Sequence, residues 1–364
     1  MKNKIIAYYL PQYHPIPEND EWWGKGFTEW TTVGKAKPLF RNHYQPRVPA
    51  DLGYYDLRIP EVREKQAVLA KEAGIYGFCY WHYWFGNGKQ LLEMPFNEVL
   101  KSGSPDFPFC LGWANESWKA KVWDSSAEKE DKVLIEQIYP GEKDVINHFL
   151  SCKKAFADNR YIKNEGKPIF LIYKPLLYND IRSFIAIWNR LIKEYGIATK
   201  FYFIANISSV DEKKRCLELG FDAVTYNPIC RMMKEYEKRG WLKKQFYRLY
   251  QHFTSRPLRT FDYSKVSKLF FDEEDTDENV IPFILPNWDH SPRSGRYSIV
   301  LQNSTPKLFG AHVKKVLQGI SNKKNKLIFL KSWNEWGEGN YMEPDLRYGK
   351  GYIDTLGKIV KEYE

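Results

Sequence analysis

Residues 327–340 read Leu-Ile-Phe-Leu-Lys-Ser-Trp-Asn-Glu-Trp-Gly-Glu-Gly-Asn. The first four residues form a short apolar run, typical of a buried strand, that ends abruptly in two tryptophans and two glutamates. Glu335 and Glu338 therefore follow a strand on a glycine-rich turn, which is where a β/α-barrel carries its chemistry. Two carboxylates held close together can differ in proton affinity, so one can donate a proton while the other accepts one. Because indole faces also suit sugar rings, this stretch predicts a carbohydrate-active site with Glu335 and Glu338 as its catalytic pair.

Seven similar apolar runs precede this one. They span residues 5–10, 74–80, 107–113, 168–173, 201–205, 223–226 and 281–285. The segments between them carry helix signals, such as Pro60 at a first turn and Gly74 beyond a last turn. Apolar strands that alternate with helices predict parallel strands buried on both faces. Residues 8–15, after the first run, lack the glycines of a dinucleotide-binding turn, so an open doubly wound sheet is disfavoured. We predict an α/β fold: a single (β/α)8 TIM barrel, one catalytic domain over residues 1–364.

Two insertions interrupt the alternation. Residues 15–59 form a long loop after the first strand and are a candidate wall or lid of the barrel mouth. Residues 231–268, between the sixth and seventh strands, form a basic, helical insertion that holds most of the net charge of +10. Its interleaved aromatic and basic residues are Trp241, Lys243, Lys244, Phe246, Tyr247, Arg248, Tyr250 and Phe253. This pattern fits peripheral attachment to anionic lipid near a lipid-linked glycan, binding of an acidic polysaccharide, or a solvated helix that covers the barrel. No motif supports nucleic-acid binding.

Polar or aromatic residues follow nearly every apolar run. In a barrel these strand ends converge on one mouth, although they are scattered in sequence. The predicted substrate-binding residues are Tyr13, His14, Trp81, His82, Tyr83, Trp84, Trp113, Asn115, Glu116, Asn206, Tyr226, Asn287, Trp288, Asp289, Trp333, Asn334 and Trp336. For each of them the alternative is a structural role in a turn, and a single histidine more often completes a hydrogen bond than performs catalysis.

The cysteine and histidine pattern predicts no metal and no cofactor. The five cysteines are odd in number and form no CxxC pair, which indicates reduced thiols and a cytoplasmic setting. The apolar stretch before Pro11 is too short for a signal peptide, and no stretch reaches the roughly 18 apolar residues of a membrane span. We therefore expect a cytoplasmic protein, at the inner face of the membrane if the basic insertion binds lipid.

One acidic motif invites a different interpretation. Asp275-Thr-Asp277 matches the Asp-x-Asp pattern with which many nucleotide-sugar glycosyltransferases hold a metal ion. It lies within an acidic run, residues 272–278, just before the seventh strand. A solvated loop accounts for this run better, and we predict one.

The N-terminal third carries motifs that are specific enough to compare with known families. Residues 8–30 read Tyr-Tyr-Leu-Pro-Gln-Tyr-His-Pro-Ile-Pro-Glu-Asn-Asp-Glu-Trp-Trp-Gly-Lys-Gly-Phe-Thr-Glu-Trp, and Lys-Pro-Leu-Phe (37–40), His-Tyr-Gln-Pro (43–46) and Asp-Leu-Gly-Tyr-Tyr-Asp-Leu-Arg (51–58) follow. These motifs resemble the WbsX-like proteins of bacterial polysaccharide clusters, over essentially the whole chain. Through the barrel and Glu-Trp-Gly-Glu-Gly, the chain is also similar to glycoside hydrolase family 99, the endo-α-mannosidases and endo-mannanases.

The resemblance to family 99 implies a division of labour between the two glutamates. Glu335 would take the proton of the substrate's 2-hydroxyl, whose oxygen then attacks the anomeric carbon and gives a 1,2-anhydro sugar. Glu338 would protonate the leaving oxygen and then activate the incoming water or sugar hydroxyl. Net configuration would be retained without an intermediate bonded covalently to the enzyme. The route requires a 2-hydroxyl trans to the leaving group, as in α-mannose or α-rhamnose.

Three functions remain open from the sequence. The first is a retaining glycoside hydrolase or transglycosylase that acts on an oligo- or polysaccharide. The second is a glycosyltransferase in the biosynthesis of a surface polysaccharide such as O-antigen, lipopolysaccharide or capsule, although no Rossmann-like half is visible. The third is a non-catalytic glycan-binding barrel, which would not need a pair of glutamates with different proton affinities.

Overall fold

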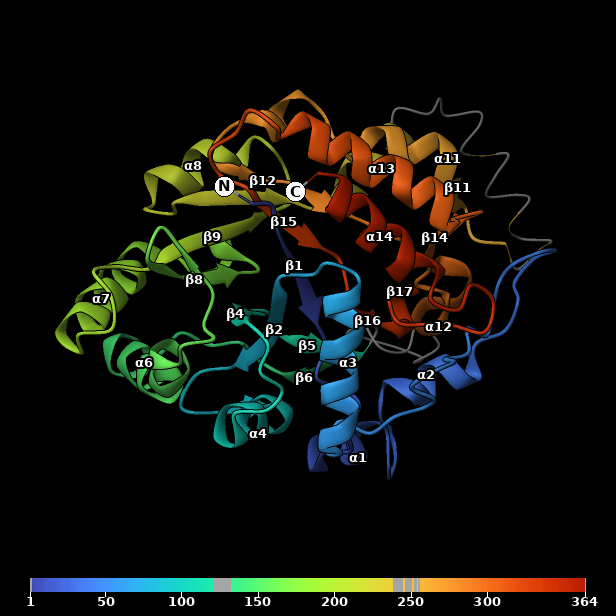
Figure 1. Ribbon diagram of the computed structural model, residues 1–364. Helices are drawn as coiled ribbons and strands as arrows, with labels where there is room; N and C mark the ends of the chain where they lie inside the picture. Colours follow the sequence, from blue (N-terminus) through green and yellow to red (C-terminus); the bar gives the residue numbers. More distant parts are fainter. Residues whose placement is uncertain are drawn as a thin grey trace.

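The computed structural model describes residues 2–120, 132–237 and 256–363, together with residues 245, 251 and 254. The predicted apolar runs form one parallel sheet that curls into a barrel, with helices around it (Figure 1). Its strands are β1 (Lys4–Tyr9), β2 (Gly77–Trp84), β4 (Phe109–Trp113), β8 (Lys167–Ile172), β9 (Tyr202–Ile207), β10 (Ala223–Tyr226), β12 (Val280–Ile281), β13 (Phe283–Ile284) and β15 (Leu327–Leu330). Their order around the sheet is β12-β10-β9-β8-β4-β2-β1-β15-β13. The predicted TIM barrel is confirmed.

The seventh apolar run completes the ring in two pieces. β12 pairs with β10, and β13 pairs with β15. Pro282 lies between the two pieces and has no N–H to donate to a sheet ladder, so the strand breaks there. The carbonyl of Pro282 nevertheless accepts a hydrogen bond from the Phe329 N–H at 2.9 Å. One run of sequence thereby bridges the two ends of the sheet.

The helices follow the strands as the alternation predicts. They are α3 (Pro60–Glu72), α4 (Met94–Ser102), α6 (Glu142–Ala157), α7 (Ile181–Glu194), α8 (Glu212–Glu218), α13 (Pro306–Gly319) and α14 (Gly351–Glu362). Pro60 occupies the first turn of α3, where a missing N–H costs nothing. Gly357 lets α14 approach the end of α3, because a Cβ there would lie 2.3 Å from the Glu72 carbonyl oxygen.

The structure also contains shorter helices and strands. They are α1 (Pro17–Trp23), α2 (Glu29–Lys35), α9 (Pro228–Glu237), α11 (Tyr263–Val266), α12 (Ser291–Ser294), β3 (Gln90–Leu91), β5 (Trp118–Lys119), β6 (Val133–Ile135), β7 (Lys163–Asn164), β11 (Arg259–Asp262), β14 (Ile299–Gln302), β16 (Asn334–Glu335) and β17 (Asn340–Tyr341). The predicted long loop after β1 contains α1 and α2. Trp30 of α2 packs against Trp336, with ring centroids 5.5 Å apart, so this insertion packs against the turn after β15.

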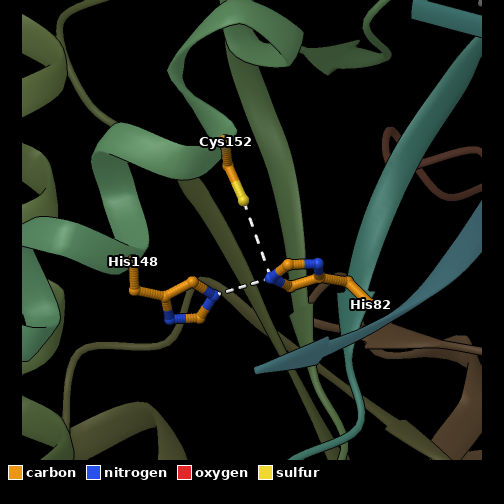
Figure 2. Close-up of side chains that lie close together, drawn as sticks. All are labelled: His82, His148 and Cys152. Atoms are coloured by element: carbon orange, nitrogen blue, oxygen red, sulfur yellow. Dashed lines mark hydrogen bonds between the residues drawn. The ribbon is translucent and has the colours of Figure 1, made fainter. Parts of the chain in front are cut away.

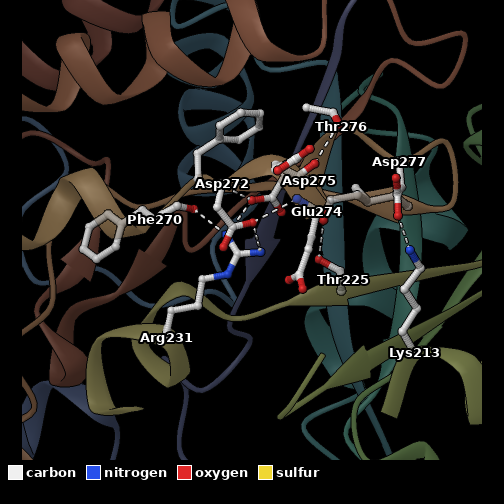
Figure 3. A network of polar contacts seen from close by, with 12 residues as sticks. Lys213, Thr225, Arg231, Phe270, Asp272, Glu274, Asp275, Thr276 and Asp277 are labelled. Carbon is white, nitrogen blue, oxygen red and sulfur yellow. Dashed lines mark hydrogen bonds and ion pairs between the residues drawn. The ribbon is translucent and has the colours of Figure 1, made fainter. Parts of the chain in front are cut away.

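The acidic run before β12 is not simply a solvated loop, as the sequence predicted. Asp275 is buried and paired with Arg231 of α9, whereas the exposed Asp277 pairs with Lys213 of α8 (Figure 3). The prediction was wrong for Asp275 because the basic insertion supplies a partner from a distant part of the sequence. The two aspartates bind different cations, which argues against a shared metal.

The lipid-binding prediction for the basic insertion concerns other residues. The aromatic and basic residues singled out above, Trp241 to Phe253, lie outside the described residues. Within the described part of the chain, no helix has the length and apolar character needed to cross a membrane.

Candidate active site

A cleft of about 470 Å³ opens at the carboxyl ends of the barrel strands. Residues at or just after the ends of β1, β2, β4, β8 and β15 line it, which is the face where a barrel carries its chemistry. Five of the predicted site residues lie in this lining: Trp81, Tyr83, Glu116, Glu335 and Glu338. The other lining residues are Leu10, Ala114, Ser117, Trp118, Lys119, Tyr173, Leu177, Arg293 and Lys331.

The turn after β15 is fixed by glycines. No side chain fits at Gly337, because a Cβ there would lie 1.6 Å from an oxygen of Glu29. Gly339 has φ +56, a left-handed conformation that favours glycine, and its Cβ would meet Asp289 at 2.7 Å. The close approach of these neighbours holds Glu335 and Glu338 in one arrangement toward the cleft.

Side chains of the same turn anchor it to the barrel. The Asn334 carboxamide accepts from the Leu10 N–H at 2.8 Å and donates to the Leu10 carbonyl at 3.0 Å. The Trp336 indole donates to buried Glu343 at 2.6 Å and stacks on Tyr341, with centroids 3.7 Å apart. Trp333 and Trp336 are fully buried, so the expectation that they offer their faces to a sugar is wrong. Their indoles support the turn from beneath.

Two cations lie between and beside the two carboxylates. Lys331 Nζ lies 3.7 Å from Glu335 and 3.6 Å from Glu338. Arg293 of α12 donates to Glu338 at 3.0 Å and also pairs with buried Glu29 at 2.8 Å. Glu338 Oε2 is the oxygen that lies 3.6 Å from Lys331, so this buried atom is held in an ion pair.

The electrostatics separate the two proton affinities. Burial, followed by the neighbouring Glu338 carboxylate, raises the pKa of Glu335 to about 7. Burial would also raise the pKa of Glu338, but Lys331, Glu335 and Arg293 together outweigh it and lower that pKa below its usual value. At a pH between these two pKa values the pair therefore holds one proton, which rests on Glu335, and at pH 7 Glu335 is about half protonated. Such a pair is suited to acid–base chemistry.

We expect Trp81→Phe to shift the proton affinity of Glu335. The Trp81 indole donates to Glu335 Oε1 at 3.0 Å, and this bond favours the ionised carboxylate. Phe keeps a ring in the cleft wall but removes the N–H. The pKa of Glu335, measured by ¹³C NMR of labelled glutamate, should rise above that of the wild type. An unchanged pKa would show that the indole bond has no electrostatic effect.

Several predicted residues at the ends of β2 and β4 lie away from the cleft. His82 and Trp84 point out of the barrel toward α6, since neighbouring residues on a strand face opposite sides. Trp113 is buried against Phe184, with ring centroids 5.3 Å apart. The Asn115 side chain accepts a hydrogen bond from the Lys174 N–H at 2.7 Å and donates one to the Lys174 carbonyl at 2.9 Å, so it holds a loop in place.

Others lie beneath the mouth or in neighbouring hollows. The buried Tyr13 hydroxyl contacts the backbone of residues 334 and 336, and His14 is buried outside the cleft lining. Asn206 lines an adjoining hollow that shares Glu116 and Leu177 with the cleft. The remaining four are Tyr226, packed under Arg231; Trp288, packed under Lys331; and Asn287 and Asp289, which line a separate cavity of about 240 Å³.

Sequence reasoning missed the two cations. Lys331 directly follows an apolar strand and precedes Glu335 by four residues, a signal that could have been recognised. Arg293 lies on the four-residue helix α12, and no local pattern ties it to the turn that carries Glu335 and Glu338. Only the fold brings it to Glu338.

The fold and the site define the class of protein as a β/α-barrel with a carboxylate-lined cleft at the carboxyl ends of its strands. Residues 5–356 match the family model described as Glycosyltransferase WbsX, and the chain belongs to this family. It is 36% identical over 357 residues to the uncharacterized protein WxcX of Xanthomonas campestris pv. campestris strain B100, and 35% identical over 365 residues to WxcX of strain ATCC 33913. These alignments cover 96% of this chain and 48% of either relative, so the chain spans about half the length of the curated relatives it matches.

Solved structures support the fold. The GH99 endo-α-mannosidase of Bacteroides thetaiotaomicron, in complex with Bis-Tris propane, superposes with a TM-score of 0.56 at 16% identity, covering 100% of this chain and 98% of that one. A glycoside hydrolase-like protein gives a TM-score of 0.54 at 17% identity, covering 98% and 94%. At these identities the similarity establishes the barrel and no more.

Proposed function

We propose that the chain cleaves or transfers an α-linked, manno-configured glycan with retention of configuration, through a 1,2-anhydro sugar, in the metabolism of a bacterial surface polysaccharide. The observation that carries the proposal is the pair Glu335 and Glu338. Both line one cleft from one turn, and their pKa values are shifted in opposite directions. A binding protein has no need of such a pair.

The spacing of the pair suits attack by the substrate's own hydroxyl. A carboxylate that attacks the anomeric carbon itself stands about 5–5.5 Å from the acid, across the glycosidic bond. Here both carboxyls come from the same turn, in which Glu338 follows Glu335 by three residues. In the proposed route, one carboxylate removes the 2-hydroxyl proton, O2 bonds to C1, and the C1–O bond to the leaving group breaks as the other carboxyl protonates that oxygen. Water or a sugar hydroxyl then opens the anhydro ring from the opposite face.

The roles implied by the family 99 resemblance place the proton on Glu338 and the base on Glu335. In the free cleft the proton rests on Glu335 instead. Both arrangements nevertheless place one proton on the pair, so they differ only in which glutamate carries it. We therefore infer that the shared proton passes from Glu335 to Glu338 when substrate fills the cleft. Pairs that interact this closely titrate as a unit.

The size of the site favours an oligo- or polysaccharide over a single sugar. The adjoining hollow of about 410 Å³ shares Glu116 and Leu177 with the catalytic cleft, which gives room for further units. Tyr83 and Trp81 supply the aromatic surface on one side of the cleft.

We expect kcat/KM to depend on pH as a bell. The pKa of Glu335 lies at about 7, so the pair loses its last proton, and with it the acid, as pH rises through that value. The acidic limb should lie below 4.5, where the lowered pKa of Glu338 lets the pair take a second proton. Initial rates on a cleaved substrate from pH 3 to 10 test this. A rate still constant well above pH 7 would contradict it.

The substrate class is tested with defined α-mannosides and α-rhamnosides, including disaccharides as acceptors. ¹H NMR should show the α-anomer as the first product, and an acceptor sugar should give transfer products if the enzyme is a transglycosylase. Release of the β-anomer would exclude the retaining route. Turnover of nucleotide sugars without glycan cleavage would establish the glycosyltransferase alternative, and binding without turnover the glycan-binding alternative.

A further inference from the structure

A cluster of three metal-ligating side chains lies on the outer side of β2, away from the cleft. His82 comes from β2, and His148 and Cys152 come from α6 (Figure 2). Residues four apart lie on one face of a helix, so both α6 side chains face the strand. The flanking residues Trp81 and Tyr83 line the cleft on the opposite side of β2. The cluster therefore sits directly behind the proposed active site.

The donor atoms are close enough to share one ion. One ligand atom from each residue lies within 4.8 Å of the other two. Cys152 Sγ is 3.6 Å and His148 Nε2 is 2.9 Å from His82 Nε2. Zinc bond lengths in a tetrahedral site imply about 3.6 Å between nitrogen and sulfur and about 3.3 Å between two nitrogens. The Cys152–His82 distance already fits, the Cys152–His148 distance is within 4.8 Å, and the two imidazoles need to separate by a few tenths of an ångström.

The surroundings hold the ligands in place. The His148 ring stacks on Trp84, at 4.8 Å between centroids and 5° between planes, and packs edge-on against Trp188. All three ligand residues are buried. A small cavity of about 30 Å³, which His82 and Cys152 help to line, has room for roughly one water as a fourth ligand. Buried, pre-positioned donors bind a metal without a large ordering cost.

We propose that His82, His148 and Cys152 bind a zinc-class divalent ion that fastens β2 to α6. Two imidazoles and one thiolate suit Zn²⁺, whereas Mg²⁺ and Ca²⁺ prefer oxygen ligands. On binding, the Cys152 thiol loses its proton to solvent and its sulfur bonds the ion. The ion lies behind the cleft wall, so its role is structural: it fixes the strand that carries Trp81 and Tyr83. Local sequence patterns do not reveal this set of ligands, because His82 is 66 residues from His148.

The experiment uses the full chain, purified with a phosphine reductant and freed of metal by a chelator. Co²⁺ is added as a probe, followed by Zn²⁺. We expect one equivalent of Co²⁺ to give tetrahedral visible bands and a thiolate charge-transfer band, all displaced by Zn²⁺, and Zn²⁺ to raise the Tm. Cys152→Ser and His148→Gln should each weaken Co²⁺ affinity by at least ~100-fold, beyond the loss typical of outer-shell changes.

Cys216→Ser is the matched control, because Cys216 is a buried cysteine outside the cluster. It should bind Co²⁺ like the wild type. X-ray absorption of the zinc-loaded wild type should show one sulfur and two imidazoles, and it decides the question even if the ligand variants fail to fold. Binding by the wild type that is no tighter than that of Cys152→Ser, or a zinc shell without sulfur, would overturn the proposal and leave a hydrogen-bonded cluster. These outcomes do not depend on what the cleft cleaves.

Discussion

Glu335→Gln and Glu338→Gln should each lower kcat/KM on an unactivated α-glycan by on the order of 10²–10⁴-fold, with the fold intact. Glutamine keeps the shape of the side chain but neither takes nor gives a proton at neutral pH. Both carboxyls line the cleft, and both have shifted pKa values. Glu194→Gln, an exposed carboxyl on α7, is the control and should retain wild-type rates. Full activity in both cleft variants would refute the proposed function.

An aryl glycoside with a good leaving group separates the two roles. Such a substrate needs little protonation of its leaving oxygen, so a variant that lacks only the acid should recover much of the lost rate on it. The proposed roles predict recovery for Glu338→Gln and none for Glu335→Gln. The opposite result would assign the acid to Glu335, in keeping with where the proton rests in the free cleft. Equal losses on both substrates would contradict any division of labour.

The barrel could be predicted because its signal is local and repeated. Each buried parallel strand must be apolar on both faces, so every run is visible in sequence without knowledge of its neighbours. The one departure, the split into β12 and β13, falls at Pro282, which has no N–H for the ladder. Closure of the ring depends on pairing between β13 and β15, which local patterns do not show.

The site was predicted less completely, for two physical reasons. Residues at strand ends were all assigned to the mouth, but side chains alternate, so Trp81 and Tyr83 reach the cleft while His82 and Trp84 face α6. The second reason is that polar partners come from far along the chain. Trp336 is held below the turn by Glu343, and nothing in the local pattern distinguishes a supporting indole from a sugar platform.

Arg293→Met should destabilise the protein by about 3–5 kcal/mol at neutral pH, because it leaves a buried carboxylate without its cation. The Glu29 side chain is fully buried, and Arg293 lies 2.8 Å from it. Burial already raises the pKa of Glu29, and Arg293 opposes this rise. Urea unfolding of the variant and the wild type measures the difference in the free energy of unfolding. An unchanged value would mean that the pair has no part in holding α2 against α12.

The pH dependence and a double variant identify the cause of that loss. Without Arg293, the pKa of Glu29 in the folded protein lies still further above its unfolded value of about 4.3, so folding takes up a proton. The loss of stability in Arg293→Met should be smallest below about pH 4.3, the unfolded pKa of Glu29. It should grow as the pH rises from there through the folded pKa. Glu29→Gln combined with Arg293→Met removes the charge altogether and should recover part of the lost stability at pH 7. If the double variant is as unstable as the sum of the single ones, the loss comes from packing around the Arg293 side chain and not from an unpaired charge.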